Sequence, residues 1–160
     1  MDIRAAAPED LPALLDLTCR VFEPFYERSF RPVAGEAVFA NRHGDWRGDY
    51  ERLLANVHNP AEGRFAAVAW DDGAIAGYVG YVLQADQHHG EIEILAVPEG
   101  ARRRGVGRAL VDHAEAALKS AGVRVVSIGT GGDDFHAPAR ALYESLGFTP
   151  FPTVSYTKEI

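Results

Sequence analysis

With 160 residues, of which 47% are hydrophobic, the chain is long enough to bury one full core and too short for two ordinary domains, so we expect a single domain over residues 1–160. The formal net charge of -7 argues against nucleic-acid binding, which depends on basic side chains. No apolar run approaches the roughly 20 residues of a membrane span. The single cysteine excludes an intrachain disulfide and the first residues lack a signal-peptide pattern, so we expect a cytoplasmic protein.

The N-terminal part of the chain begins regularly and then breaks up. A short strand is predicted to end near Ala6, followed by a helix from Pro8 or Glu9 with one apolar face. Residues 22–62 are interrupted by prolines and glycines and are predicted to be irregular, although 46–57 is compatible with a helix. This stretch holds many of the aromatic residues: Phe22, Phe25, Tyr26, Phe30, Phe39, Trp46 and Tyr50. Such a stretch is often a binding loop or lid, and the alternative that its aromatics complete the core stays open.

The middle of the chain predicts a meander of strands followed by a helix. Residues 64–70 and 74–84 are rich in Val, Ala, Tyr and Phe, and the Asp-Asp-Gly that joins them is typical of a hairpin. Residues 91–97 are expected to add a third antiparallel strand. The amphipathic spacing of residues 105–121 predicts a helix, and Gly122 provides the left-handed residue that closes it.

The C-terminal part predicts a parallel strand and the end of the sheet. Residues 123–129 are mostly apolar and β-branched, which predicts a strand covered on both faces. Because a right-handed crossover precedes it, this strand should lie parallel to residues 91–97, with a ligand in the gap between them. After a loop, we expect a helix over 137–146 and one or two closing strands within 148–160.

The turn before the predicted helix at Gly105 suits an anion. It reads Arg102-Arg-Arg-Gly-Val-Gly107, which brings positive charge and two glycines to a helix start. Backbone N–H groups at a helix N-terminus lack intrahelical partners and the helix dipole adds partial positive charge, so the turn is expected to bind a pyrophosphate. Leu110 occupies the place of the third glycine of a dinucleotide fingerprint, and the Gly-Lys-Ser/Thr of a P-loop is absent.

Three spaced motifs occur in order along the chain: Leu95-Ala-Val97, Arg102-x-x-Gly105-x-Gly107 and Ala139-x-x-Leu142-Tyr143-x-x-x-Gly147-Phe148. Together they resemble the GNAT superfamily, the Gcn5-related N-acetyltransferases. The resemblance covers residues 64–148 well and residues 2–17 loosely. It implies an α/β (α+β) fold in which a mixed, mostly antiparallel sheet of six to seven strands is flanked by about four helices and splayed between residues 91–97 and 123–129.

The resemblance also implies acetyl-CoA (coenzyme A) as co-substrate, and no metal. In the family, the Arg-x-x-Gly-x-Gly backbone holds the coenzyme pyrophosphate, and pantetheine lies in the splay like an added strand. His136 departs from the asparagine that many members have there, which leaves its role open. The residues expected at the coenzyme are Leu95, Ala96, Val97, Arg102, Arg103, Arg104, Gly105, Val106, Gly107, Arg108, His136, Ala139 and Tyr143.

The catalytic roles are likewise implied by matching positions. The N–H of Leu95 is expected near the thioester carbonyl, and Tyr143 is the expected acid for the leaving thiolate. A lysine-like amine has a pKa of about 10.4, so the acceptor must lose a proton before or during attack. Glu91 and Glu93 are the candidate bases. A base acting through water, or deprotonation by solvent, stays open.

The expected function is transfer of an acetyl group to a primary amine of a small, cationic acceptor by direct attack, without nucleic-acid or membrane partners. The residues expected to bind the acceptor are Phe25, Tyr26, Phe30, Trp46, Glu91 and Glu93. Two alternatives stay open: a protein N-terminal or lysine acetyltransferase, and a noncatalytic acyl-CoA-binding sensor on the same fold. The acyl chain length and the oligomeric state, with a homodimer as one alternative, are not determined by the sequence.

Overall fold

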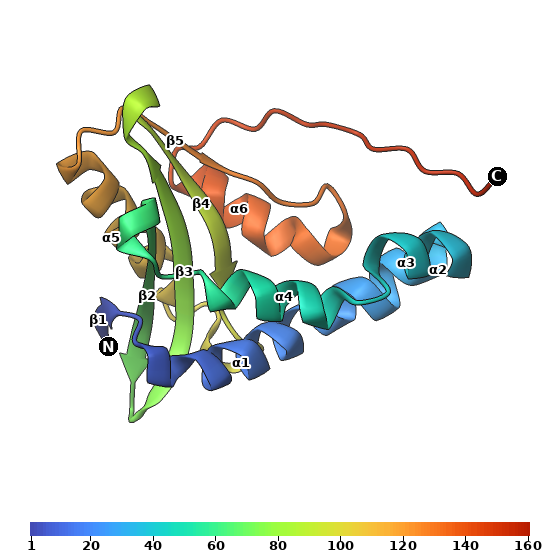
Figure 1. The fold of residues 1–160 in the computed structure, drawn as a ribbon, viewed down its shortest axis with the longest axis horizontal. Helices are drawn as coiled ribbons and strands as arrows, with labels where there is room; N and C mark the ends of the chain where they lie inside the picture. The colour runs from blue at the N-terminus through green and yellow to red at the C-terminus, as the bar shows by residue number, and fades with distance from the viewer.

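The computed structural model describes residues 1–160 and shows a five-stranded sheet between layers of helices (Figure 1). The strands follow chain order across the sheet: β1 (Asp2–Ala5), β2 (Arg64–Asp71), β3 (Ala74–Gln84), β4 (His89–Ala96) and β5 (Val125–Ile128). Only β4 and β5 pair in parallel, as predicted, and the other neighbours are antiparallel. The Asp-Asp-Gly hairpin between β2 and β3 is also confirmed.

Two apolar clusters fill the space on either side of the sheet. The first packs against α5 (Val106–Ser120), and the second packs against α1 (Leu11–Pro24) and α4 (Trp46–Ala55). Side chains of β2 alternate between them, because Ala67 and Ala69 belong to the first cluster whereas Ala66 and Val68 belong to the second. The sheet is therefore covered on both faces over most of its width.

Residues 22–62 are mainly helical, so the prediction of an irregular stretch was wrong. After α1, a π-helical turn (Phe25–Phe30) leads into α2 (Arg31–Ala34) and α3 (Glu36–His43), and α4 confirms the helix within 46–57. Pro24 is the last residue of α1 and Pro32 lies in the first turn of α2, so neither proline stands in the interior of a regular α-helix. Gly35, at φ 81°, separates α2 from α3.

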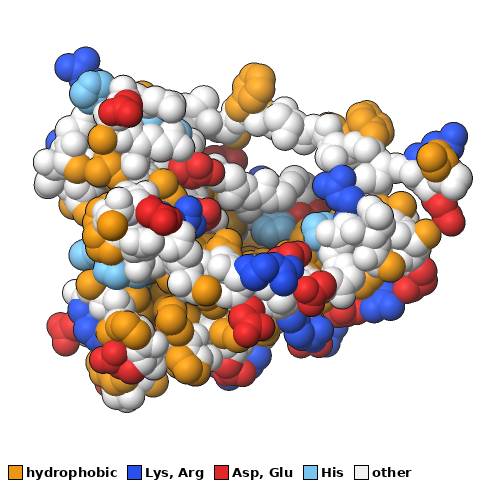
Figure 2. Space-filling model, viewed as in Figure 1, with side chains coloured by type: hydrophobic (Ala, Val, Ile, Leu, Met, Phe, Trp, Pro, Cys, Tyr) orange, Lys and Arg blue, Asp and Glu red, His pale blue; other side chains and the backbone are white.

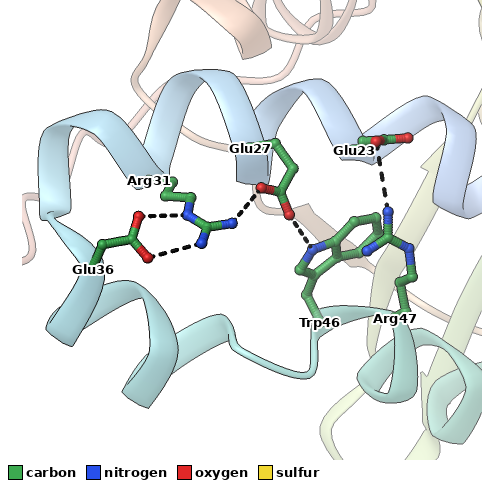
Figure 3. Close-up of polar contacts among 6 residues, drawn as sticks. All are labelled: Glu23, Glu27, Arg31, Glu36, Trp46 and Arg47. Carbon is green, nitrogen blue, oxygen red and sulfur yellow. Dashed lines mark hydrogen bonds and ion pairs between the residues drawn. The ribbon is translucent and has the colours of Figure 1, made fainter.

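Polar contacts join this helical layer (Figure 3). Glu27 of the π-helical turn accepts a hydrogen bond from Trp46 Nε1 at 3.3 Å and pairs with Arg31 at 2.7 Å. Arg31 also pairs with Glu36 at 2.7 Å. Trp46 is 2% exposed and stacks on Tyr26 with ring centroids 4.7 Å apart. These aromatics therefore pack largely against one another.

The C-terminal segment differs from the prediction. Residues 149–160 form no strand, so the sheet has five strands instead of the six or seven expected. Two prolines, Pro150 and Pro152, lack the N–H that a ladder requires. The outer strand β5 is not covered on both faces either, because Val125 is 61% exposed. The helix α6 (Ala137–Ser145) follows β5, as predicted. None of the helices combines the length and apolar character needed to cross a bilayer.

One buried hydrogen bond links α1 to the centre of the sheet. Thr18 and Tyr78 are both fully buried, and their hydroxyl oxygens lie 2.6 Å apart. The Thr18 hydroxyl donates to Leu14 C=O at 2.6 Å, so the Tyr78 hydroxyl is the donor to Thr18. Burial raises the pKa of Tyr78 above its ordinary value, so the hydroxyl stays neutral in the folded protein.

The substitution Tyr78→Phe is expected to lower the free energy of unfolding by about 1 kcal/mol, because Thr18 loses a buried donor. Urea denaturation measures the change. Tyr81→Phe is the matched control, since Tyr81 is also buried but its hydroxyl makes no hydrogen bond in the protein, and it should change stability less. Equal losses in the two variants would contradict the assignment.

Candidate active site

The site starts from an irregularity in β4. Neighbouring residues Gly80 and Tyr81 of β3 pair with Ile94 and Ile92, so Glu93 is an extra residue in β4. This is a β-bulge, and it turns the strand. In a regular strand, Ile92 and Ile94 would share a face, but here Ile92 belongs to the α5 cluster and Ile94 to the α1–α4 cluster.

The two parallel strands part at the same level. Their ladder runs from His89 opposite Val125 to Ile92 opposite Ile128 and ends there. The remainder of β4, from Glu93 to Ala96, has no partner on its β5 side. The predicted splay is therefore confirmed.

A cavity of about 760 Å³ adjoins the unpaired end of β4. Its walls come from that strand end, the basic turn, α6, the loop before α6, and α1. The lining residues are Val21, Phe22, Leu95, Val97, Glu99, Arg102, Arg103, Gly105, Gly107, Arg108, Phe135, His136, Pro138, Ala139, Ala141, Leu142 and Tyr143. One end is therefore basic, and the other is mainly apolar.

The basic end presents unpaired backbone donors. None of the six N–H groups from Arg103 to Arg108 donates a hydrogen bond to the protein, and the first helical bond of α5 runs from Ala109 N–H to Gly105 C=O at 3.0 Å. Arg103 and Gly105 have φ of 59° and 84°, which shapes the turn. A run of free N–H groups at a helix start, with arginines beside it, fits an anionic pyrophosphate.

The arginines of this turn have different partners. Arg102 Nε–H donates to Val97 C=O at 3.1 Å, which links the turn to the end of β4. Arg108 donates to Ser145 Oγ at 3.0 Å. Arg104 instead pairs with Asp71 of the β2–β3 hairpin at 2.8 Å and does not line the cavity. Arg102, Arg103 and Arg108 thus supply the positive charge of the cavity wall.

Tyr143 brings the single phenol of the cavity wall. It projects from α6 and is 9% exposed, with its ring edge-on to Phe148 at 6.2 Å. Burial raises the pKa of Tyr143 to about 12. The hydroxyl therefore keeps its proton throughout the neutral and mildly alkaline range.

The loop before α6 is held by contacts that the sequence analysis did not find. His136 Nδ1 lies 2.5 Å from Asp133 Oδ1, and Arg140 donates to the carbonyls of Gly131 and Asp133 at 2.7 Å each. Phe25 packs edge-on against His136 at 4.8 Å, which joins the π-helical turn to this loop. The Asp-x-x-His spacing was the available signal for the first contact, whereas nothing local marks Arg140.

The two candidate bases lie in different surroundings. Glu93, the bulged residue, forms an ion pair with Arg64, whose Nε–H also donates to Asn56 C=O at 2.8 Å. Glu91 is exposed and has no cationic partner. It lies opposite Ser127 of β5, before the strands part. Neither carboxylate lines the cavity.

Most of the coenzyme residues expected from the sequence meet in this cavity: Leu95, Val97, Arg102, Arg103, Gly105, Gly107, Arg108, His136, Ala139 and Tyr143. Ala96 and Val106 are buried in the core, at 0% and 2% exposure. The cavity wall does not include any of the four aromatics expected at the acceptor, Phe25, Tyr26, Phe30 and Trp46. Phe22 and Phe135 line the cavity instead. No local sequence pattern marks these two residues, because tertiary packing brings them to the cavity.

A bulged and splayed sheet beside a helix start with free N–H groups places the chain among α/β domains with a ligand cavity at a strand edge. The chain belongs to the acetyltransferase (GNAT) family, whose model matches residues 17–148. This confirms the resemblance. Members of this family use acetyl-CoA.

Two curated relatives match part of the chain. Mycothiol acetyltransferase of Beutenbergia cavernae is 40% identical over 98 residues, which cover 61% of this chain and 29% of that protein. The uncharacterized N-acetyltransferase YsnE of Bacillus subtilis is 34% identical over 80 residues, which cover 50% of this chain and 52% of that protein. The matched region thus spans about half or less of each relative.

A solved structure shares the fold over nearly the whole chain. The PaiA N-acetyltransferase of Thermoplasma acidophilum, solved in complex with coenzyme A, superposes with a TM-score of 0.73 at 16% identity. The match covers 96% of this chain and 92% of that one. At this identity the likeness shows the fold alone.

Gly105→Ala is expected to lower the free energy of unfolding by about 1–2 kcal/mol, because an alanine at φ 84° is strained. Gly100→Ala in the same turn region is the matched control. Neither added Cβ meets an atom within 4 Å, but Gly100 does not have a positive φ. Thermal or urea unfolding compares the two, and similar losses would show that backbone strain is not the cause.

Proposed function

We propose that the chain is an N-acetyltransferase that transfers an acetyl group from acetyl-CoA to a primary amine of a small, cationic acceptor. The observation that carries this proposal is one cavity in which the free N–H groups of Arg103–Arg108, the unpaired end of β4 and the neutral phenol of Tyr143 meet. Family membership supports the same activity.

The residues of the cavity divide into two parts for holding the coenzyme. The N–H groups of Arg103–Arg108, with Arg102, Arg103 and Arg108, would bind its anionic end. Leu95 and Val97 line the cavity where β4 no longer pairs with β5, so in the proposal their backbone pairs with the amides of an extended ligand, which would displace Arg102 from Val97 C=O. When bound, acetyl-CoA supplies the acetyl group as an activated thioester.

The reaction forms a bond from the amine nitrogen to the acetyl carbon and breaks the bond from that carbon to sulfur. In the proposal, Leu95 N–H stabilises the negative charge that develops on the carbonyl oxygen, which is worth on the order of 3 kcal/mol in the barrier. Tyr143 O–H donates a hydrogen bond to the leaving sulfur. Because burial raises the pKa of Tyr143 to about 12, the phenol keeps its own proton during this step. The thiolate leaves the cavity and then takes a proton from solvent.

Glu91 is the proposed base, acting through water. A strand rises about 3.3 Å per residue, so Glu91 starts roughly 13 Å along β4 from Leu95, too far for direct contact with an amine there. Glu93 starts nearer, but its carboxylate is engaged by Arg64. The free and exposed carboxylate of Glu91 can accept a proton relayed by water and return it to solvent.

The acidic character of the protein supports a cationic acceptor. The net charge is -7, and the exposed carboxylate of Glu91 on β4 has no cationic partner to offset its charge. The apolar rings of Phe22 and Phe135 in the cavity wall would accommodate the carbon skeleton of a small amine. Polyamines, aminoglycosides and amino-acid amines combine these properties.

A panel of such amines, with acetyl-CoA and an assay for released thiol, tests the proposal. We expect turnover with at least one small cationic amine. The apparent affinity for that amine should weaken at high salt, because screening reduces its electrostatic attraction to the acidic protein. Binding of acetyl-CoA without thiol release for any amine would instead establish the noncatalytic sensor. Turnover with peptide N-termini or lysine peptides alone would establish the protein-modifying alternative.

Tyr143→Phe is expected to lower kcat about 10²-fold while the KM for acetyl-CoA changes little, because the phenol acts on the leaving sulfur in the transition state. Steady-state thiol release measures both constants. Tyr81→Phe serves as the control, since Tyr81 is similarly buried but lies outside the cavity. Full turnover in Tyr143→Phe would show that another group assists the thiolate.

Glu91→Gln is expected to lower kcat/KM about 10²-fold near neutral pH, and the deficit should shrink toward pH 10, where more of the amine is already neutral. Glu93→Gln is the matched control at the neighbouring carboxylate, and we expect a smaller effect that does not depend on pH. A larger, pH-dependent loss in Glu93→Gln would transfer the role of base to that residue.

A further inference from the structure

The segment after α6 has no regular secondary structure and is largely exposed. Residues 149–160, here called the arm, make no hydrogen bond or ion pair with the rest of the protein. Figure 1 shows the arm, in red, running along one side of the molecule toward α2 and α3. Phe151, Val154 and Tyr156 are 90%, 75% and 90% exposed, and hydrophobic side chains stand out along the arm at the top of Figure 2. An arm with so many exposed apolar side chains needs a partner surface.

The sequence of the arm is suited to a strand. Residues 153–157 read Thr-Val-Ser-Tyr-Thr, which are mostly residue types that favour strands and which alternate polar and apolar side chains. Pro150 and Pro152 cannot donate to a ladder, so pairing can begin only after Pro152. The arm therefore contains about five residues that can add to a sheet edge.

The sheet has a free edge of matching length. β5 is the last strand in the sheet order, and its four residues pair with β4 on one side only. It carries no charged side chain, bulge or proline that would block another strand, and Val125 is 61% exposed. Natural proteins protect such edges by one of these devices or by a covering segment, so an unprotected β5 indicates that a strand covers it.

We propose that the arm of one copy pairs with β5 of a second copy, and that the exchange is reciprocal. Each copy offers one free strand segment, the arm, and one free sheet edge, β5. In a two-fold symmetric dimer, each arm pairs with the β5 edge of the other copy, so that no arm or edge is left unpaired. Within one copy the two do not meet. The end of the arm, Thr157–Ile160, lies beside residues 37–42 of α3 instead of along β5.

The oligomeric state of the full chain tests this inference, measured by light scattering during size-exclusion chromatography. We expect the wild type at twice the chain mass, and the variant lacking residues 149–160 at the chain mass. That deletion removes no hydrogen bond of the domain. Val125→Lys places a charge on the edge and should also give the chain mass. Val33→Lys is the matched control on exposed α2, at 89% exposure, and should remain at twice the mass.

Mixing identifies the contact. The deletion variant retains a free edge and Val125→Lys retains a free arm, so the mixture should form a heterodimer although neither variant pairs with itself. A monomeric wild type would overturn the proposal. Hydrogen exchange on such a monomer would show whether the arm is instead protected by pairing with β5 of its own chain. A deletion variant that still dimerises would also overturn it, because the interface would then lie elsewhere.

Discussion

The extra residue in β4 is the constraint on which the site depends. A single unpaired position at Glu93 rotates the strand, so that side chains two residues apart face different layers of the core. The ladder with β5 ends directly before it. A sheet that continued in register would close over the backbone of Leu95 and Val97, and the cavity would have no strand edge to offer. The same bulge at Glu93 therefore determines how β4 packs in the core and where the sheet opens at the site.

The distribution of charge complements this opening. The protein is acidic as a whole, yet four arginines, Arg102, Arg103, Arg104 and Arg108, lie at the start of α5, beside backbone N–H groups that make no hydrogen bond within the protein. Arg64 neutralises the bulged Glu93 and contacts the carbonyl of Asn56 just after α4, so the bulge is held from the side opposite α5. The cavity is therefore basic at one end and mainly apolar at the other, while the exposed carboxylate of Glu91 lies on β4 outside its wall. This polarity suits a reaction between an anionic donor molecule and a cationic acceptor.

Local sequence signals predicted those parts of the fold that local physics determines. The hairpin was predictable because Asp72 and Gly73 adopt positive φ values of 50° and 80°, which only a few residue types tolerate together. The motif residues of the basic turn likewise lie in the cavity. In contrast, Pro24 and Pro32 misled the prediction for residues 22–62. The sequence shows that a proline is present, but it does not show whether that proline lies at a helix boundary, where it is tolerated, or in a helix interior, where it breaks the helix. The pairing of Arg64 with Glu93, and the support of the loop by Arg140, arise from tertiary packing and leave no local pattern.

The hydrogen bond from Arg102 to Val97 C=O has a consequence for the choice of donor molecule. A ligand that pairs with the end of β4 must compete with the guanidinium for this carbonyl. A phosphate at the adjoining helix start offers the displaced guanidinium a better partner, since charge-assisted hydrogen bonds to phosphate are stronger than those to a carbonyl. A thioester that lacks the phosphate end offers no such exchange and leaves the cation to water. Under the proposed function, this exchange would favour the complete coenzyme over a bare acyl-pantetheine chain before any chemistry begins.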